Sequence, residues 1–233
     1  MNGEALEAIE RRIVVCERCP ELRAYCAEVA RVKKRAHRDE AYWGRPVPAF
    51  GDSGARVLLV GLAPGAHGSN RTGRMFTGDA SGEWLYRALY RAGFANQPHQ
   101  RDRQDGLVLK GALVTAALRC APPNNAPTPR QRTHCAPYLA EEIATLGDLR
   151  VVVGLGAIGT RAAVEALLTS GYRFSGRLAF AHGAETVATR DGAHVTVVAS
   201  YHPSRQNTNT GVLSEAMLDA IFMRAAALAH ETA

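Results

Sequence analysis

The chain has 233 residues, of which 46% are hydrophobic, and this is enough for one sizeable buried core. No apolar run approaches the roughly 18 residues that a membrane-spanning helix needs. The acidic start of the chain also lacks the apolar core of a signal peptide. We therefore expect a cytoplasmic protein with no membrane partner. The formal net charge of +6 leans towards a polyanionic partner, although it is a weak indication on its own.

The N-terminal part is predicted to be helical over residues 3–15 and again, in a charged segment, around 20–38. The end of the second segment is strongly basic, with the sequence Arg31-Val-Lys-Lys-Arg-Ala-His-Arg38. As a solvated helix face this run needs no partner. A role in binding a polyanion gains weight if the run lies on the same side as the Gly-rich loop that follows.

That loop comes directly after an apolar, β-branched run, Val57–Val60, which predicts a buried strand ending at Gly61. The loop is rich in glycine and polar residues and continues to Asp79. A buried strand that opens into such a loop places polar groups at the carboxyl edge of a sheet, where open α/β folds bind ligands. Connections this long are usually functional. Asp79 also stands where it would cap the next helix.

Strands and helices alternate through the rest of the chain. Helices are predicted over residues 80–92, 129–146, 157–168 and 212–228. Strands are predicted over residues 112–118, 150–154, 178–181, 186–190 and 195–199, with a hairpin turn at Asp191-Gly192. This alternation predicts an α/β three-layer sandwich with a central, mostly parallel sheet. No linker or repeat is visible, so residues 1–233 are expected to form a single domain.

The cysteines suggest a metal or cluster site. Cys16 and Cys19 form a C-x2-C pair, and Cys120 and Cys135 supply two further sulfurs in Pro-bearing contexts. Four sulfurs in this arrangement suit a tetrathiolate zinc site or a 4Fe–4S cluster, and the spacing does not choose between them. The alternative is a set of unconnected core cysteines. Cys26 is the odd one out and is expected to be a buried thiol.

A second glycine motif, Gly154-Leu-Gly-Ala-Ile-Gly159, matches the G-x-G-x-x-G pattern of dinucleotide-binding proteins. It follows the third core strand instead of opening the first βαβ unit, and no acidic residue ends a strand at the expected distance. A tight turn and close helix packing explain these glycines equally well. We therefore do not favour nicotinamide binding.

Three separated motifs, taken with the four cysteines, carry a resemblance to a known family. They are Gly61-Leu-Ala-Pro-Gly65 with Gly73-Arg-Met-Phe-Thr-Gly-Asp79, then Arg119-Cys-Ala-Pro-Pro123, then His202-Pro-Ser204. Together they closely resemble the bacterial and archaeal family 5 uracil-DNA glycosylases, over most of the chain. The resemblance implies the fold of that superfamily and an enzyme that hydrolyses the N-glycosidic bond of uracil in DNA. It also implies release of other deaminated bases, such as hypoxanthine.

The same resemblance assigns the site residues. It implies that Cys16, Cys19, Cys120 and Cys135 hold a structural 4Fe–4S cluster. The catalytic residues it implies are Asp79, Asn125 and His202, with His202 facing the uracil O2. Those lining the base pocket are Gly61, Ala63, Gly65, Phe76 and Ala116, with Phe76 stacking on the flipped base. Apart from the resemblance, Arg74 is expected to shape the Gly-rich loop or to contact a DNA phosphate, and Ser204 and Arg205 are expected to contact DNA.

Two of these positions predict a permissive pocket. Other uracil-DNA glycosylases carry a water-positioning Asp or Asn where this chain has Ala63, and a uracil-reading Asn where it has Ala116. Since buried hydrogen-bond readers give the steepest discrimination, their loss predicts broader base specificity. No lysine lies in the three motifs, so we expect a monofunctional enzyme that leaves an abasic site. We also expect a monomer acting on double- and single-stranded DNA. The alternative is a non-catalytic, metal-stapled nucleic-acid-binding module.

Overall fold

The centre of the molecule is a seven-stranded sheet in the order β1-β3-β2-β4-β7-β6-β5, as seen in a computed structural model that describes residues 2–176 and 179–231. The four central strands are parallel and the outer ones antiparallel. The strands are β1 (Phe50–Gly51), β2 (Val57–Gly61), β3 (Ala112–Ala116), β4 (Val151–Leu155), β5 (Arg173–Phe174), β6 (Glu185–Arg190) and β7 (Ala193–Ser200). Every residue of β2, β3 and β4 is buried, as expected for parallel strands covered on both faces.

The helices within the described ranges are α1 (Asn2–Val14), α2 (Pro20–Val32), α3 (Ser69–Thr72), α4 (Ala80–Arg91), α5 (Pro129–Thr145), α6 (Gly156–Thr169), α7 (Arg205–Asn209) and α8 (Glu215–His230). Short 3-10 turns cover Arg35–His37 and Pro123–Asn125. The sequence sets the helix starts by capping. Thr128 and Gln131 form a capping box at α5, and the Ser214 side chain accepts from the Met217 N–H at α8. None of the described helices is both long and apolar enough to cross a membrane.

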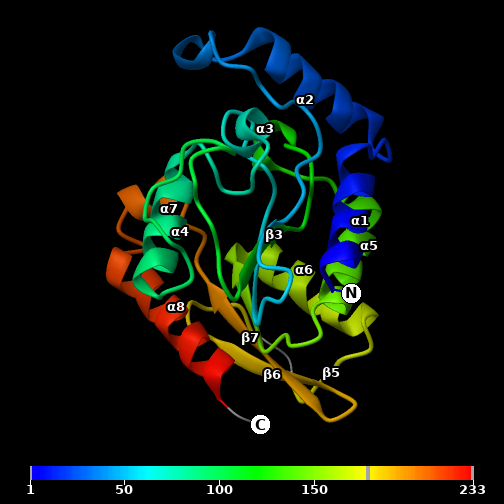
Figure 1. Ribbon diagram of the computed structural model, residues 1–233, viewed down its shortest axis with the longest axis vertical. Helices are drawn as coiled ribbons and strands as arrows, with labels where there is room; N and C mark the ends of the chain where they lie inside the picture. The colour runs from blue at the N-terminus through cyan, green and yellow to red at the C-terminus, as the bar shows by residue number, and fades with distance from the viewer. Residues whose placement is uncertain (1, 177–178, 232–233) are drawn as a thin grey trace.

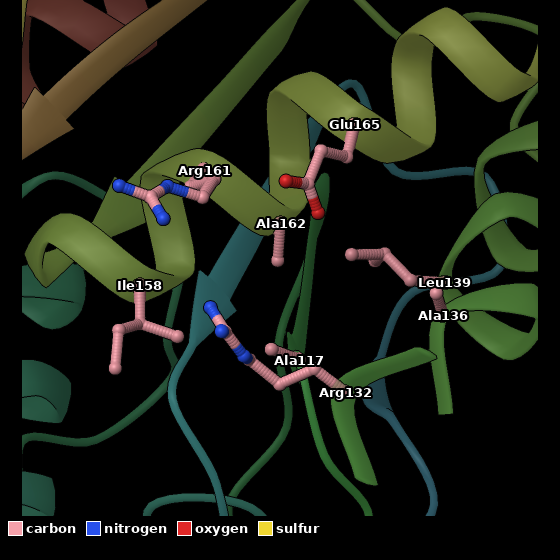
Figure 2. Close-up of a pocket in the computed structure, with 8 residues that line it drawn as sticks. All are labelled: Ala117, Arg132, Ala136, Leu139, Ile158, Arg161, Ala162 and Glu165. Carbon is pink, nitrogen blue, oxygen red and sulfur yellow. The ribbon is translucent and has the colours of Figure 1, made fainter. Parts of the chain in front are cut away.

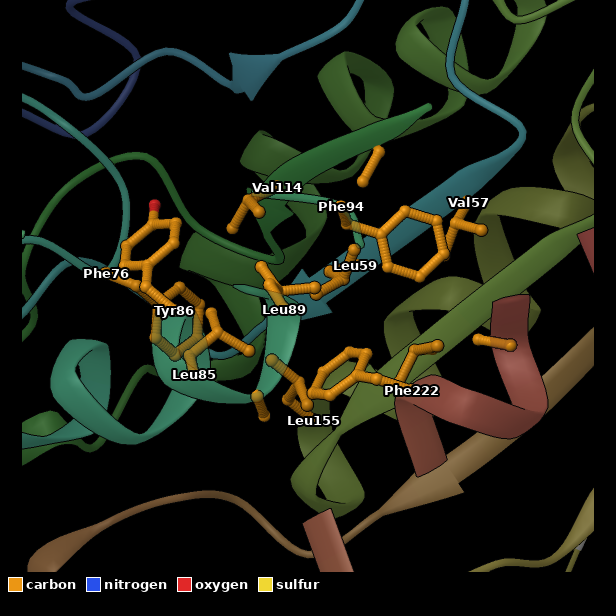
Figure 3. Packing of buried hydrophobic residues seen from close by; sticks show 14 of the residues in the cluster. Val57, Leu59, Phe76, Leu85, Tyr86, Leu89, Phe94, Val114, Leu155 and Phe222 are labelled. Carbon is orange, nitrogen blue, oxygen red and sulfur yellow. The ribbon is translucent and has the colours of Figure 1, made fainter. Parts of the chain in front are cut away.

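Two apolar clusters hold the layers together. On one face, Val57 and Leu59 of β2 pack with α4 and α8, and Figure 3 shows Leu89 and Phe222 meeting over these strands. On the other face, Leu58 and Val60 pack against α5 and α6. Figure 1 shows these helices on opposite sides of the sheet, with α1 lying along α5. The predicted three-layer α/β architecture is therefore confirmed.

Most predicted elements are present, and the differences have local causes. The second helix ends at Val32 instead of 38, because Lys33 takes a left-handed φ of 58°. The Asp191-Gly192 hairpin is confirmed between β6 and β7, with both residues at positive φ. The strand predicted over 178–181 is wrong for residues 179–181, and its first residue lies outside the described ranges. The two-residue strands β1 and β5 are too short for a sequence pattern to predict.

Candidate active site

The motif loops meet at the carboxyl edge of the sheet. Gly61 ends β2 and stands in register with Ala116 at the end of β3, and His202 follows β7. The rings of Phe76 and His202 are stacked, with centroids 5.8 Å apart and an interplanar angle of 29°. Phe76 comes from the Gly-rich loop after β2, so residues about 126 positions apart meet here. Thus the first and third motifs converge on one site, as the sequence predicts.

Three glycines allow this close packing. A Cβ built on Gly61 would lie 2.6 Å from the Phe76 ring, a contact that only glycine avoids. A Cβ on Gly156 would lie 3.1 Å from the Cβ of His202, and one on Gly159 would lie 2.3 Å from the Val60 carbonyl oxygen. The G-x-G-x-x-G glycines therefore serve helix packing and the placement of His202.

His202 lies in a fixed turn before α7. Its carbonyl oxygen accepts a hydrogen bond from the Asn207 side chain at 2.9 Å. Burial lowers the pKa of His202 to about 4, so the ring is neutral at neutral pH. A neutral imidazole donates a hydrogen bond from one ring nitrogen. Ser204, predicted to contact DNA, caps α7 by accepting from the Asn207 N–H at 3.3 Å, and Arg205 is exposed in its first turn.

Asp79 caps α4, as predicted, and its carboxylate also lies against the Gly-rich loop. One carboxylate oxygen accepts from the Gly82 N–H at 3.1 Å. A Cβ on Gly65 would lie 2.9 Å from the other oxygen, so this turn can contain no larger residue without a shift. Burial raises the pKa of Asp79, opposed by the N–H groups of its helix and by the positive charges of Arg205 and Arg71.

Arg74 is buried within the Gly-rich loop. Its side chain is 4% exposed and its guanidinium pairs with Asp105, with a closest N–O distance of 2.6 Å. It also donates to the Thr77 hydroxyl. Arg74 therefore shapes the loop, which is one of its two expected roles, and its charge is paired with the buried Asp105, so the expected contact with DNA stays a prediction. The motif itself does not indicate this partner, which lies some thirty residues later, in the irregular segment between α4 and β3.

The irregular segment between α4 and β3 also contains a second residue, besides Asp105, that the sequence does not predict to take part in the site. Gln100 accepts a hydrogen bond from the Gly78 N–H at 2.5 Å and donates to the Asp79 carbonyl oxygen at 3.2 Å. Across the loop, Arg71 donates to the Gly78 carbonyl oxygen at 2.9 Å. The loop that carries Phe76 and Asp79 is therefore held from two sides.

The remaining predicted residues lie at different places around the stacked pair of Phe76 and His202. Ala116 is buried at the end of β3, and Ala63 is half-buried in a small cluster with Ile158. Asn125 is exposed on the turn after β3, with a left-handed φ of 54°. Among the described residues, the Asn125 side chain makes no hydrogen bond, so the structure does not tie it to Asp79.

The four predicted cluster cysteines line one pocket. Cys16, Cys19, Cys120 and Cys135 surround it, and α1, α2, the Cys120 loop and α5 meet there. The Arg119 N–H donates to the Cys135 sulfur at 3.3 Å. Within the described ranges, no group of three or more Cys, His, Asp or Glu side chains is arranged to hold a metal ion. Cys26 is fully buried, as predicted.

A buried ion pair stands behind this pocket. Arg119 and Glu142 are 1% and 0% exposed, and their closest N–O distance is 2.7 Å. The Thr115 hydroxyl donates to the same carboxylate at 2.8 Å and also accepts from Arg119. These contacts join β3 to α5, close to Cys120 and Cys135. The burial of the second-motif arginine, Arg119, is not predicted from the sequence, because its partner Glu142 is on a distant helix.

A different pocket opens between α5 and α6 (Figure 2). Arg132 from α5, with Arg161 and Glu165 from α6, surrounds an apolar floor that includes Leu139 and Ile158. No predicted site residue lines it. The stacked aromatic pair, not this pocket, therefore marks the candidate active site.

The chain has well-matched relatives along nearly its whole length. A sequence model of the Uracil DNA glycosylase superfamily matches residues 48–226. A type-5 uracil-DNA glycosylase of Thermus thermophilus is 50% identical over 96% of this chain and 98% of its own length. A protein of that name from Pyrobaculum aerophilum is 44% identical, over 93% of this chain and 90% of its own length. One from Mycobacterium tuberculosis is 48% identical, over 93% and 79%. The predicted resemblance is confirmed, and the chain belongs to the type-5 uracil-DNA glycosylases of this superfamily.

Proposed function

We propose that this protein hydrolyses the bond between deoxyribose and uracil in DNA and leaves an abasic site in an uncut strand. The observation that carries the proposal is the stacked pair of Phe76 and His202, with Asp79 held beside the same loop. Breaking this bond builds positive charge on the sugar and negative charge on the base. The enzyme must therefore shelter a flipped base and stabilise both charges.

Phe76 and His202 serve the departing base. The Phe76 face offers a stacking surface, and the neutral His202 ring donates a hydrogen bond to the uracil O2. This bond strengthens as negative charge grows on the oxygen, and a donor of this kind is typically worth about 10²–10³ in rate. Because burial lowers the pKa of His202, the ring is neutral at neutral pH and has one N–H to donate.

Asp79 serves the sugar and the water. A carboxylate near the anomeric carbon stabilises an oxocarbenium-like state and orients the attacking water, as in glycoside hydrolysis. The charges of Arg205 and Arg71 favour the ionised form of Asp79 against the cost of burial. Asn125 is the further candidate for handling water, from the exposed turn after β3. No lysine is present in the motifs to form a Schiff base, so the strand stays intact.

We propose that the pocket also accepts hypoxanthine and other deaminated bases, in double- and single-stranded DNA. Ala116 and Ala63 leave the strand ends without an amide or carboxylate to read the base edge. A pocket without such readers rejects a wrong base only weakly. Stacking on Phe76 is indifferent to base identity, because every base has a π-face.

We further propose that the four-cysteine pocket binds a 4Fe–4S cluster. All four thiols line one pocket, and the Cys135 sulfur accepts a backbone N–H, a contact that favours a thiolate. Four thiolates suit a tetrathiolate zinc site as well as a cluster, and the resemblance to family 5 uracil-DNA glycosylases favours the cluster. When bound, the cluster would supply a structural tie between the N-terminal helices, the Cys120 loop and α5. Hydrolysis itself needs no electron.

The test is base release from duplexes that carry one uracil or one hypoxanthine. We expect both to be released, with strand breaks appearing only after alkali. His202→Ala should lose about 10²–10³ in single-turnover rate while still binding the duplex. His194→Ala is the matched control, because His194 is exposed at the far end of β7. No release of any base by the wild type would instead favour the non-catalytic binding module. Release of uracil alone would refute the permissive pocket.

A further inference from the structure

The basic segment that includes the end of α2 and the turn after it, residues 31–38, is packed against the Gly-rich loop that carries Phe76 and Asp79. The Lys34 N–H donates to the Tyr42 hydroxyl at 3.3 Å, and that hydroxyl lies 3.1 Å from Nδ1 of His67 in the Gly-rich loop. The Tyr42 and His67 rings meet edge to face at 6.1 Å. Figure 1 shows α2 and the segment that follows it at the same end of the molecule as α3. The condition set by the sequence, that this run lie beside the Gly-rich loop, is therefore met.

A second set of contacts anchors the same segment. Glu40 is ion-paired with Arg71 of α3 and accepts from His37 at 2.6 Å. The Trp43 N–H also donates to the Arg71 carbonyl oxygen at 2.8 Å. Arg71 in turn holds Gly78, next to Asp79, so the segment and the active-site loop share one anchoring side chain.

Not all of the cations in the segment are free. Lys33 donates from its ammonium to the Arg38 carbonyl oxygen at 3.1 Å and so closes the turn. By contrast, the side chains of Lys34, Arg35 and Arg38 are exposed and have no ion-pair partner among the described residues. Of the acidic neighbours, Glu40 is already paired, which leaves Asp39 as the nearest exposed carboxylate in the chain.

Positive charge continues from this segment to the mouth of the active site. Burial, and after it the charges of Lys34, His37 and Arg71, lower the pKa of His67. On the other side, the charge of Arg205 reaches Asp79. A substrate strand that presents its base to Phe76 must lay its phosphates across this region. Exposed cations on a fixed turn beside the site suit such phosphates.

We propose that Lys34, Arg35 and Arg38 form a phosphate-binding strap that holds the DNA backbone beside the active site. The proposal rests on the proposed action on DNA, but its test needs no base excision. Each phosphate contact contributes about 0.9 to the slope of log affinity against log salt concentration. Three lost contacts should therefore flatten the slope by two to three units and weaken binding roughly tenfold to hundredfold at 0.15 M salt.

The experiment measures binding to an undamaged duplex between 50 and 300 mM salt. The test variant is K34Q/R35Q/R38Q. The matched control is K110Q/R150Q/R173Q, which removes the same charge at the opposite, amino edge of the sheet. We expect the large loss and the flatter slope only in the test variant, with the thermal midpoint unchanged in both. The single substitution Arg35→Gln should lower the slope by about one unit, which covers the case of a poorly folded triple variant.

The outcomes separate cleanly. Equal losses in the two triple variants would show a general charge effect and overturn the strap, as would an unchanged slope in Arg35→Gln. Failure of the wild type to release uracil would overturn the proposed activity without touching this measurement, because the duplex used here contains no damaged base.

Discussion

The half-buried imidazole of His202 makes fold stability depend on pH in a predictable way. Burial holds the pKa of this ring at about 4, against 6.5 in an unfolded chain. Above pH 6.5 the ring is neutral in both states and the fold has its full stability. Below 6.5 the unfolded chain takes up the proton first, so stability is lost until about pH 4. The shift of about 2.5 pKa units corresponds to about 3 kcal/mol in all.

Comparing the wild type with His202→Gln isolates the contribution of His202 to the pH dependence of the unfolding free energy, because glutamine keeps a polar side chain but does not titrate. Urea unfolding at steps from pH 7.5 to 4.5 should show the wild type losing about 2.5 kcal/mol relative to the variant. Other titrating groups contribute to both proteins and cancel. Parallel pH curves would refute the lowered pKa of His202, and with it a ring that stays neutral below pH 6.5. A neutral ring also predicts that uracil release has no acid limb near pH 6.5.

Three further substitutions, the last paired with a control variant, test the surroundings of the site. Asp79→Asn keeps an acceptor for the α4 cap but removes the charge. Uracil excision should therefore fall at least roughly tenfold, while the unfolding free energy changes by under about 1 kcal/mol. Near-normal excision would leave Asp79 only its capping role. Asp105→Ala strands the buried guanidinium of Arg74 and should cost about 3–5 kcal/mol in urea unfolding. A loss under about 1 kcal/mol there would mean that the pair is not closed in solution. Cys135→Ala should lose iron and visible absorbance on purification, whereas Cys26→Ala should keep both, and equal iron in the two would contradict the cluster assignment.

Local patterns in the sequence are sufficient to predict the three layers of the fold and the carboxyl edge of the sheet as the place of the site. The continuous apolar runs of the central strands, such as Val57–Val60, have a single physical explanation, burial on both faces of a parallel sheet. Two of the central strands, β2 and β7, end in the first and third motifs at the same edge, so the meeting of Phe76 and His202 there follows from the topology. The capping residues Asp79 and Thr128 placed the helix starts to within a residue.

What sequence patterns could not predict were contacts between distant segments. The sequence around Arg74 does not decide between shaping the loop and contacting phosphate, because its partner Asp105 is 31 residues away in the chain and only the fold brings it close. Gln100 sits in a stretch with no regular pattern, so its hold on Gly78 had no local signal. The end of α2 was misplaced because a basic run resembles a helix face, whereas a single left-handed residue, Lys33, ends it.

The hydrogen bonds that hold the loop carrying Phe76 from two sides affect how the enzyme would find damaged bases in DNA. Gln100 and Arg71 fix that loop through its own backbone before any duplex arrives, so closing around the base requires little rearrangement of the protein. The energetic hurdle then lies in the DNA, in breaking the stack and the pair. Mispaired bases such as uracil opposite guanine open more readily than Watson–Crick pairs. We expect such an enzyme to select bases by how easily they unpair and unstack from the DNA duplex rather than by their shape and hydrogen-bonding groups.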